Sequence, residues 1–165
     1  MALLNTPTKK VVAGAISAVV LLIAPYTANF EGKRNRAYLD PVGIPTVCYG
    51  YTHGVKLGDS YTDEQCMQML LEELAVSEKQ VESCIGKSSR TGVPYPLPFR
   101  ATMTDFTYNV GEGAFCKSTA AKKAREGDLI GACQETLKWM YAKKKFLNGL
   151  KTRRETLYPL CSKDL

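Results

Sequence analysis

The sequence predicts an α+β fold, with one small sheet followed by about four or five helices. Residues 31–61 are rich in Tyr, Thr, Val and Gly and have a turn signal at Asp40-Pro41, which is typical of a β-hairpin or a three-stranded sheet. From residue 62 to the C-terminus, helical apolar patterns alternate with glycines and polar loops. The 165 residues suffice for one domain, or for one domain with two lobes.

An uncharged apolar run, residues 11–30, precedes the expected sheet. As one helix it would be about 30 Å long, enough to cross the hydrocarbon core of a bilayer. Its content of Ala, Gly, Ser and Thr is high for a membrane anchor, so a cleaved signal peptide and a buried core helix are alternatives. Cleavage after Ala28 would place Tyr26 at position −3, where small residues are needed. We favour an uncleaved export signal, and Lys9-Lys10 predicts an N-terminus inside and a C-terminus outside.

Residues 62–84 predict a long helix, because Thr62 and Gln65 form a capping box and apolar residues recur at helical spacing. Residues 86–98 contain closely spaced prolines, which excludes a helix there. Later helices are expected at residues 99–110, ended by Gly111 and Gly113, at 118–125, at 128–141 and around 150–160, with a basic loop at 143–145.

The net charge of +6 fits a solubility margin or attraction to a polyanion such as nucleic acid, acidic lipid or an anionic cell wall. None of the six cysteines lies in a CxxC pattern and the single histidine is His53, so we expect no metal site and no cofactor. An even number of scattered cysteines predicts up to three disulfides and an oxidising compartment. Buried free thiols in the cytosol are the alternative.

Two carboxylates and a hydroxyl follow the apolar run, at Glu31, Asp40 and Thr46. A carboxyl at the end of an apolar helix, in a cleft, should hold its proton tightly, which suits Glu31 to act as a general acid. Asp40 lies in a polar turn and should stay ionised, and the hydroxyl of Thr46 can hold a water beside it. An acid, a base and a positioned water are the components of glycosidic-bond hydrolysis.

These three residues, in their spacing with Gly32, Arg34 and Tyr38, resemble the catalytic signature of phage lysozymes of the T-even type. With the apolar run included, the chain is similar to lambdoid-phage endolysins that carry a signal-arrest-release segment. Later stretches also resemble the family, at the border of its cleft and in its C-terminal lobe: residues 108–113, 131–139 and 149–155.

The resemblance implies a two-lobed lysozyme fold in which residues 62–84 join a sheet lobe to a helical lobe. It divides the chain into a signal-arrest-release segment, residues 1–30, and a catalytic domain, residues 31–165. The implied partners are peptidoglycan and, through residues 11–30, the host inner membrane, where the enzyme is held inactive before its release to the periplasm. We expect a monomer and no nucleic-acid partner.

The implied activity is that of a muramidase, which hydrolyses the β-1,4 bond between N-acetylmuramic acid and N-acetylglucosamine and so lyses the host cell. By this resemblance Glu31 is the general acid, Asp40 is the base or electrostatic partner, and Thr46 positions the water. The family also implies inversion at the anomeric carbon, with roughly 6.5–9.5 Å between the two carboxyl groups.

Secondary roles follow from the same resemblance. Arg34 is expected to hold Glu31 or Asp40, and Asn109 to bind a sugar N-acetyl group, although ordinary structural polarity explains either residue equally well. Arg153 and Arg154 are expected to pair with acids of the helical lobe. His53 receives no catalytic role, because Tyr51 stands where the family has its histidine.

The six cysteines allow many pairings. Our expectation is Cys48–Cys66, Cys84–Cys116 and Cys133–Cys161. Three other classes of function compete with a muramidase: a non-hydrolytic peptidoglycan-binding module, a lytic transglycosylase that uses Glu31 alone, and a cationic membrane-disrupting protein, which the length of the folded region disfavours.

Overall fold

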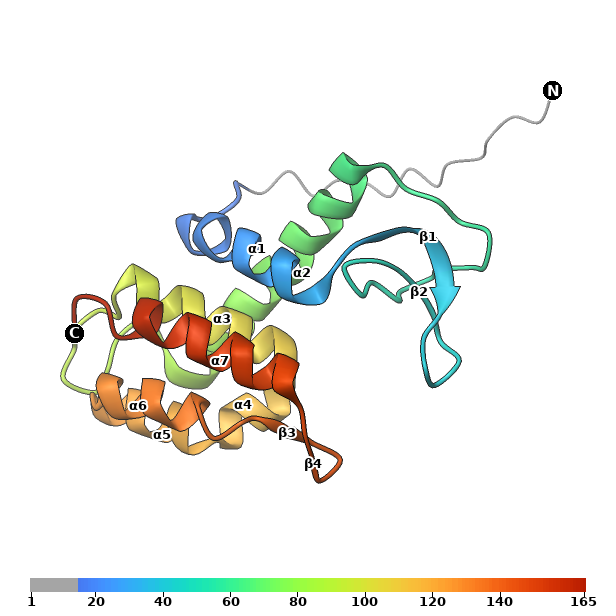
Figure 1. Ribbon diagram of the computed structural model, residues 1–165. Helices are drawn as coiled ribbons and strands as arrows, with labels where there is room; N and C mark the ends of the chain where they lie inside the picture. Colours follow the sequence, from blue (N-terminus) through green and yellow to red (C-terminus); the bar gives the residue numbers. More distant parts are fainter. Residues whose placement is uncertain (1–14) are drawn as a thin grey trace.

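The computed structural model describes residues 15–165, with a sheet lobe and a helical lobe joined by a long helix, α2 (Figure 1). The expected α+β class is confirmed. The elements in chain order are α1 (Ala18–Glu31), β1 (Arg34–Leu39), β2 (Pro45–Cys48), α2 (Asp63–Ile85), α3 (Leu97–Val110), α4 (Glu112–Lys117), α5 (Thr119–Glu126), α6 (Leu129–Thr136), β3 (Tyr141–Ala142), β4 (Lys145–Phe146) and α7 (Asn148–Cys161).

The sheet lobe is built on an antiparallel hairpin of β1 and β2. Of the two expected forms, a β-hairpin or a three-stranded sheet, the structure has the hairpin. In its register Tyr38 lies opposite Thr46, and a bulge separates this pair from the pairing of Arg34 with Cys48. Buried residues of this lobe, Val47 and Cys48 among them, pack against Cys66 of α2. The hairpin is therefore fastened to the long helix through its second strand.

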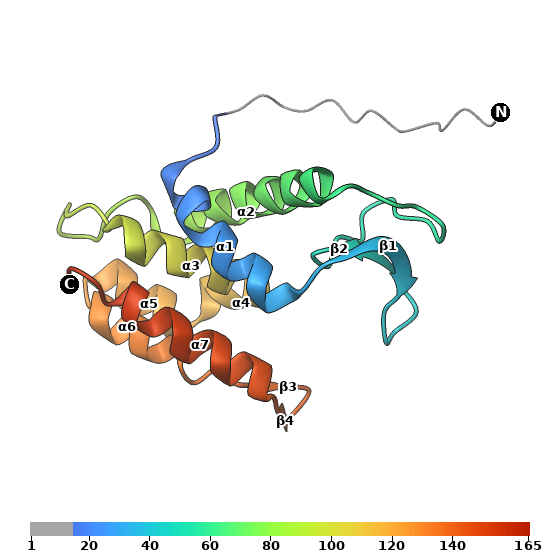
Figure 2. The same cartoon turned by 45° about the horizontal axis from the view of Figure 1, so that its top comes forward.

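The capping box of α2 is confirmed. The Gln65 amide nitrogen donates to the Thr62 hydroxyl at 3.2 Å, and the Thr62 amide donates to the Gln65 side chain at 2.8 Å. Leu70, Leu74 and Val81 of the expected stripe are buried. Because α2 contacts α1, α3, α4 and α5 as well as β2, it links the helical lobe to the sheet lobe (Figure 2).

The apolar run forms a core helix where the structure describes it. α1 packs against α2, α3 and α7, and its buried side chains share one hydrophobic cluster with those helices (Figure 2). No helix in residues 15–165 is long and apolar enough to cross a membrane. Residues 11–14 of the predicted span lie outside the described residues, and residues 18–31 adopt the buried-helix alternative. The buried side chains of α1 are Val19, Val20, Ile23, Ala24 and Thr27.

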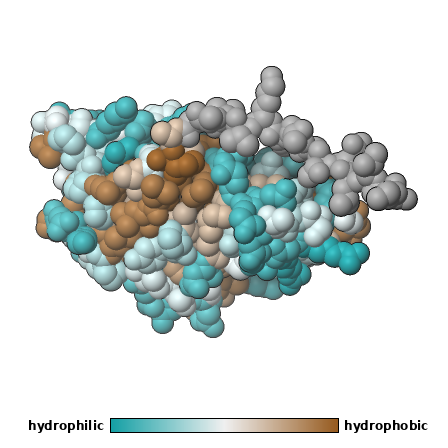
Figure 3. All heavy atoms as spheres, turned by 90° about the horizontal axis from the view of Figure 1, so that it is seen from above, coloured by the Kyte–Doolittle hydropathy of each residue, from teal (hydrophilic) through white to brown (hydrophobic). Residues whose placement is uncertain are grey.

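The outer face of α1 is also apolar. Leu21 is 58% exposed, and Figure 3 shows a hydrophobic patch on the face of the molecule where α1 lies. A helix with apolar residues all round is unusual on the surface of a globular protein.

Two expected helix boundaries are wrong, and one helix was not expected. α3 begins at Leu97, inside the expected proline loop, because Pro98 sits in the first helical turn, where its missing N–H donor is harmless. Gly111 alone ends α3, at φ 86°, and Gly113 lies inside α4, a helix that the glycine pattern concealed.

The third error concerns α6, which ends at Thr136 instead of near residue 141. Trp139 leaves the helix to pack edge-to-face on Phe106, with ring centroids 5.3 Å apart, and its carbonyl oxygen accepts a hydrogen bond from Arg154 Nε at 3.3 Å. Tertiary contacts thus override the local helical pattern. Of the expected basic loop, Lys143 and Lys144 form the turn of the β3–β4 hairpin, and Lys145 belongs to β4.

Candidate active site

Glu31 is the last residue of α1, and Gly32 ends the helix with a positive φ of 67°. Because the buried face of α1 packs on the other helices, the Glu31 side chain lies at the junction of the two lobes. Its side chain is 25% exposed and lines a pocket of about 390 Å³. Residues from four other segments line the same pocket: the loop after β2, α2, the end of α3 and the start of α4. They include Tyr49, Gly50, Glu73, Tyr108 and Asn109.

The backbone of Gly50 passes close to the Glu31 carboxylate. A Cβ atom at Gly50 would lie 3.9 Å from Glu31 Oε2, and the φ of 91° at this position favours glycine. Beside it, the Tyr108 hydroxyl donates to the Tyr49 carbonyl oxygen at 3.1 Å and so connects α3 to the sheet lobe. Burial, followed by the charge of Glu31, raises the pKa of Tyr108 above its usual range, so this hydroxyl stays protonated.

Arg153 of α7 is the charged partner of Glu31. Its Nη1 atom donates to Glu31 Oε1 at 2.6 Å, and the arginine side chain is 4% exposed. The remaining donors go to Asp105 of α3, from Nε at 2.9 Å and from Nη2 at 2.8 Å. Burial lowers the pKa of Arg153, but its hydrogen bonds and attraction to Asp105 and Glu31 outweigh burial and raise that pKa above the ordinary value.

Asp105 is fully buried and accepts a further hydrogen bond from the α1 residue Thr27, at 2.8 Å from its hydroxyl. The expected pairing of Arg153 with an acid of the helical lobe is therefore confirmed. Sequence reasoning missed Asp105 and Thr27 altogether. The available signal was an acid among apolar and small residues in the middle of a helix, a position at which a carboxylate needs a buried partner.

Asp40 lies in the turn that joins β1 to β2. Its Oδ1 atom accepts hydrogen bonds from the backbone amides of Val42, at 2.9 Å, and Ile44, at 2.8 Å. The Asp40 amide in turn donates to the Ile44 carbonyl oxygen at 3.0 Å. This turn therefore fixes the carboxylate by local backbone contacts, and it leaves Asp40 outside the group of residues that line the Glu31 pocket.

Thr46 is 4% exposed, at the start of β2, and its hydroxyl donates to the same Ile44 carbonyl oxygen at 2.9 Å. The structure thus brings Thr46 and Asp40 together around one carbonyl group. Thr46 does not line the Glu31 pocket either. Arg34, expected to hold a carboxylate, instead lies over the Tyr38 ring, 4.2 Å from its centroid.

Asn109 lines the Glu31 pocket, and its side-chain oxygen accepts a hydrogen bond from Arg154 Nη2. Arg154 was expected to pair with an acid, but its donors go to Asn109 and to the Trp139 carbonyl oxygen, so this expectation is wrong. Burial lowers the pKa of Arg154 to about 10. His53 is largely exposed, with Nε2 4.0 Å from Glu73 Oε1.

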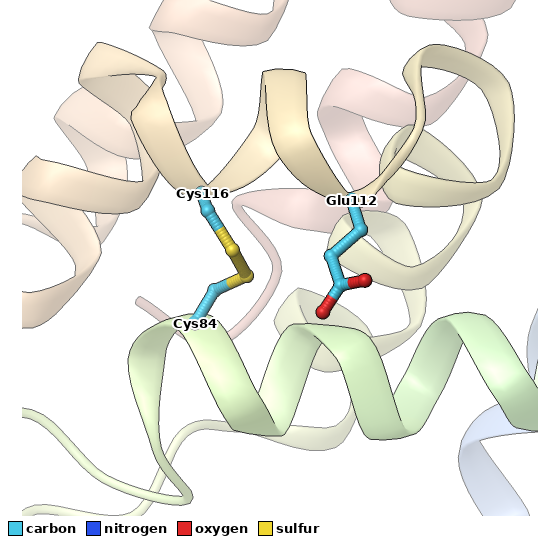
Figure 4. A group of neighbouring side chains, drawn as sticks. All are labelled: Cys84, Glu112 and Cys116. Atoms are coloured by element: carbon cyan, nitrogen blue, oxygen red, sulfur yellow. A yellow bond between two sulfur atoms is a disulfide. The ribbon is translucent and has the colours of Figure 1, made fainter.

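The structure joins the cysteines in the expected pairs, Cys48–Cys66, Cys84–Cys116 and Cys133–Cys161, with Cα–Cα distances of 5.0, 5.1 and 5.8 Å. Glu112 reaches from α4 toward the Cys84–Cys116 bond, which links α4 to α2 (Figure 4). A metal would need thiolates from this group. Because both sulfur atoms are in the disulfide, the three residues do not make a metal site in this form.

Comparisons with known proteins agree with the geometry. The family model described as phage lysozyme matches residues 28–156. The SAR-endolysin of Bacteriophage PS119 is 36% identical over 163 residues, covering 97% of this chain and 94% of that protein. The endolysin from Escherichia coli O157:H7 phage FAHEc1 has a TM-score of 0.74 at 28% identity, covering 93% of this chain and 96% of that one. The active form of P1 phage endolysin Lyz has a TM-score of 0.72 at 25% identity, covering 90% and 95%. The resemblance drawn from the motif between Glu31 and Thr46 is thereby confirmed, and so is the lysozyme-type fold.

Proposed function

Because this chain belongs to the phage lysozyme family, we propose that it is a muramidase that hydrolyses the β-1,4 bond between N-acetylmuramic acid and N-acetylglucosamine. Family membership makes it a lysozyme, a glycoside hydrolase, and its similarity to endolysins makes bacterial peptidoglycan its substrate. The observation that carries the specific proposal is the Glu31 carboxyl, which lines the pocket between the lobes beside the buried cation of Arg153.

In the proposed mechanism Glu31 gives its proton to the glycosidic oxygen, and Asp40 takes a proton from the attacking water. The backbone amides of Val42 and Ile44 both donate to Oδ1 of Asp40, so Oδ2 can act as the base. The Thr46 hydroxyl donates to a carbonyl group, so its lone pairs can accept a hydrogen bond from the water and orient it. We expect inversion, with a carboxyl–carboxyl gap of roughly 6.5–9.5 Å when substrate is bound.

Digestion of purified peptidoglycan tests this proposal. The Glu31→Gln variant should lose at least about a hundredfold in rate, since a general acid contributes that much or more. The matched control is Glu126→Gln, the same change at an exposed residue at the end of α5, and it should digest the wall at the wild-type rate. Equal rates for the two variants would contradict the assignment of Glu31.

The reaction products separate this activity from its competitors. Hydrolysis leaves reducing sugar ends, whereas a lytic transglycosylase leaves anhydro ends, which mass spectrometry resolves by the mass of one water. A binding module would release no fragments at all. NMR of fresh product reports the anomer, and a retained anomer would rule out inversion.

We also propose that residues 1–30 tether the protein to the inner membrane, C-terminus outside, until residues 31–165 act as a monomer in the periplasm. The relatives named SAR-endolysins support this, as does the apolar outer face of α1, which a membrane would cover. In a tethered state α1 would be withdrawn from α3 and α7, and Glu31 would lose its partner Arg153.

Raising the hydrophobicity of α1 tests the tether. Ala18 and Asn29 are exposed in the docked helix, so Ala18→Leu with Asn29→Leu should leave docking intact while favouring the membrane. Fractionation of expressing cells should then show more protein in the membrane and later lysis. Ala18→Gln with Asn29→Gln is the polar control, and unchanged partitioning of the Leu variant would contradict the proposal.

A further inference from the structure

Four side chains connect α1 to the proposed acid through one line of charge and hydrogen bonds. Thr27 donates to Asp105, Asp105 accepts two bonds from Arg153, and Arg153 donates to Glu31. The three helices α1, α3 and α7 each contribute at least one member. This line of contacts begins and ends on α1, because Thr27 lies four residues before Glu31.

We propose that Thr27 and Asp105 are positioning residues for Glu31. Thr27 fixes α1 on α3, and Asp105 offsets the charge of Arg153, so that Arg153 orients the acid while its attraction for the ionised carboxylate is reduced. This inference rests on the proposed function of Glu31, and it adds two residues that do not touch the pocket.

The first argument is helix register. Residues four apart on a helix lie on the same face, so the Thr27 hydroxyl and the Glu31 carboxyl point to the same side of α1. Thr27 is fully buried and its hydroxyl lies 2.8 Å from Asp105 Oδ1. Rotation or sliding of α1 would break this bond and the Glu31–Arg153 bond together.

The second argument is charge. A general acid must carry a proton, and a bare arginine 2.6 Å away would favour the ionised carboxylate. The two bonds from Arg153 to Asp105, a fully buried carboxylate, form a locally neutral pair. Asp105 thereby offsets the charge of Arg153 and takes two of its hydrogen bonds, so the guanidinium can fix the direction of the Glu31 carboxyl through its remaining bond.

Other groups around Glu31 do not supply this balance. Tyr108 stays protonated, and Glu73 lines the pocket with a partly exposed side chain. Arg154, the next residue of α7, contacts Asn109 and adds positive charge beside Arg153. Besides Glu31, the anion in contact with Arg153 is therefore Asp105, which is buried. The remaining polar groups of the pocket that titrate are Tyr49 and Glu112.

The first test is the pH dependence of the rate on soluble glycan strands, using the released full-length protein. In Asp105→Asn the charge of Arg153 is unbalanced, so Glu31 should lose its proton at lower pH. The alkaline limb of the rate profile should therefore move down by about one pH unit, the effect of one close charge. An alkaline limb at the wild-type pH would overturn the proposal, whatever the absolute rate.

The second test does not change any charge and decides the matter if Asp105→Asn fails to fold. Thr27→Val should lower kcat about tenfold with KM unchanged, because the acid is displaced and binding is not. Thr104→Val is the matched control, since Thr104 is also fully buried and its hydroxyl bonds to the Arg100 carbonyl within α3. Thr27→Ser keeps the hydroxyl and should restore kcat. Equal kcat values for Thr27→Val and Thr104→Val would overturn the positioning role.

Failure of the proposed function can be told apart from failure of this inference. If Glu31→Gln stays active, the proposed function is wrong. If Glu31→Gln is inactive while the Asp105 and Thr27 variants behave like wild type, the positioning role alone is wrong.

Discussion

Glu31 is held by side chains from distant helices, whereas Asp40 is held by the backbone of its own turn. Arg153, which orients Glu31, lies 122 residues away in the chain. The amides that bind Asp40 come from residues two and four positions later. One half of the candidate active site is therefore a product of helix packing, and the other is a product of local turn geometry.

This difference indicates where the enzyme can be regulated. Withdrawal of α1 removes Glu31 from Arg153 and should leave the Asp40 turn intact, because the hydrogen bonds of Asp40 to Val42 and Ile44 are made within the turn itself. The acid half is thus the part that a tethered N-terminus could disable. Substitutions in each half should show whether the Glu31 half depends on helix packing while the Asp40 half depends on its own turn.

Arg153→Met should have the largest effect, because it leaves Asp105 buried without its cation. We expect the free energy of unfolding to fall by roughly 3–5 kcal/mol and activity to be lost. Urea unfolding followed by circular dichroism measures the first quantity. Arg34→Met, at the cation that stacks on Tyr38, is the control and should change stability little. Equal losses of unfolding free energy in the two variants would contradict the conclusion that helix packing through Arg153 builds the Glu31 part of the site.

Removal of the disulfide that fastens the hairpin tests whether the Asp40 turn supports itself. Cys48→Ser with Cys66→Ser should lower the free energy of unfolding by about 3 kcal/mol, as should Cys133→Ser with Cys161→Ser in the helical lobe. Well below the melting temperature, we expect the first variant to clear cell walls, because the turn contacts remain. A folded but inactive variant would show that the turn depends on the tertiary structure.

Asp40→Asn should lower the rate about a hundredfold, since the amide cannot act as a base. Stability should change little, because the amide oxygen still accepts the two backbone bonds. Asp40→Ala should lose the same activity and in addition about 1 kcal/mol of unfolding free energy. Equal stabilities of the Asn and Ala variants would mean that the side chain does not hold the turn.

Thr62→Ala should have the smallest effect, because Thr62 contacts neither Glu31 and its partners nor the Asp40 turn. The N-cap of α2 is worth about 1 kcal/mol, so the melting temperature should fall while the rate per folded molecule is unchanged. Differential scanning calorimetry and wall digestion measure the two quantities. A loss of rate without unfolding would show that α2 transmits strain to the pocket.

Local sequence signals predicted much of the fold. The capping box at Thr62, the Ser118 cap of α5 and the turn signal at Asp40-Pro41 each describe contacts within a few residues, and each appears in the structure. The wrong boundary of α6 has a distant cause. α6 stops early because Trp139 packs on Phe106, a contact between residues far apart in the chain that no local pattern encodes.

For the candidate site, the sequence by itself determined the residue types and spacing of Glu31, Asp40 and Thr46, because the resemblance to phage lysozymes rests on this linear pattern. It also determined the turn around Asp40, since its hydrogen bonds close over a few residues. Only the tertiary structure decided what surrounds Glu31. A buried ion network forms when helices dock and exclude water, and the partners Asp105, Arg153 and Thr27 are chosen by that docking and not by their neighbours in the chain.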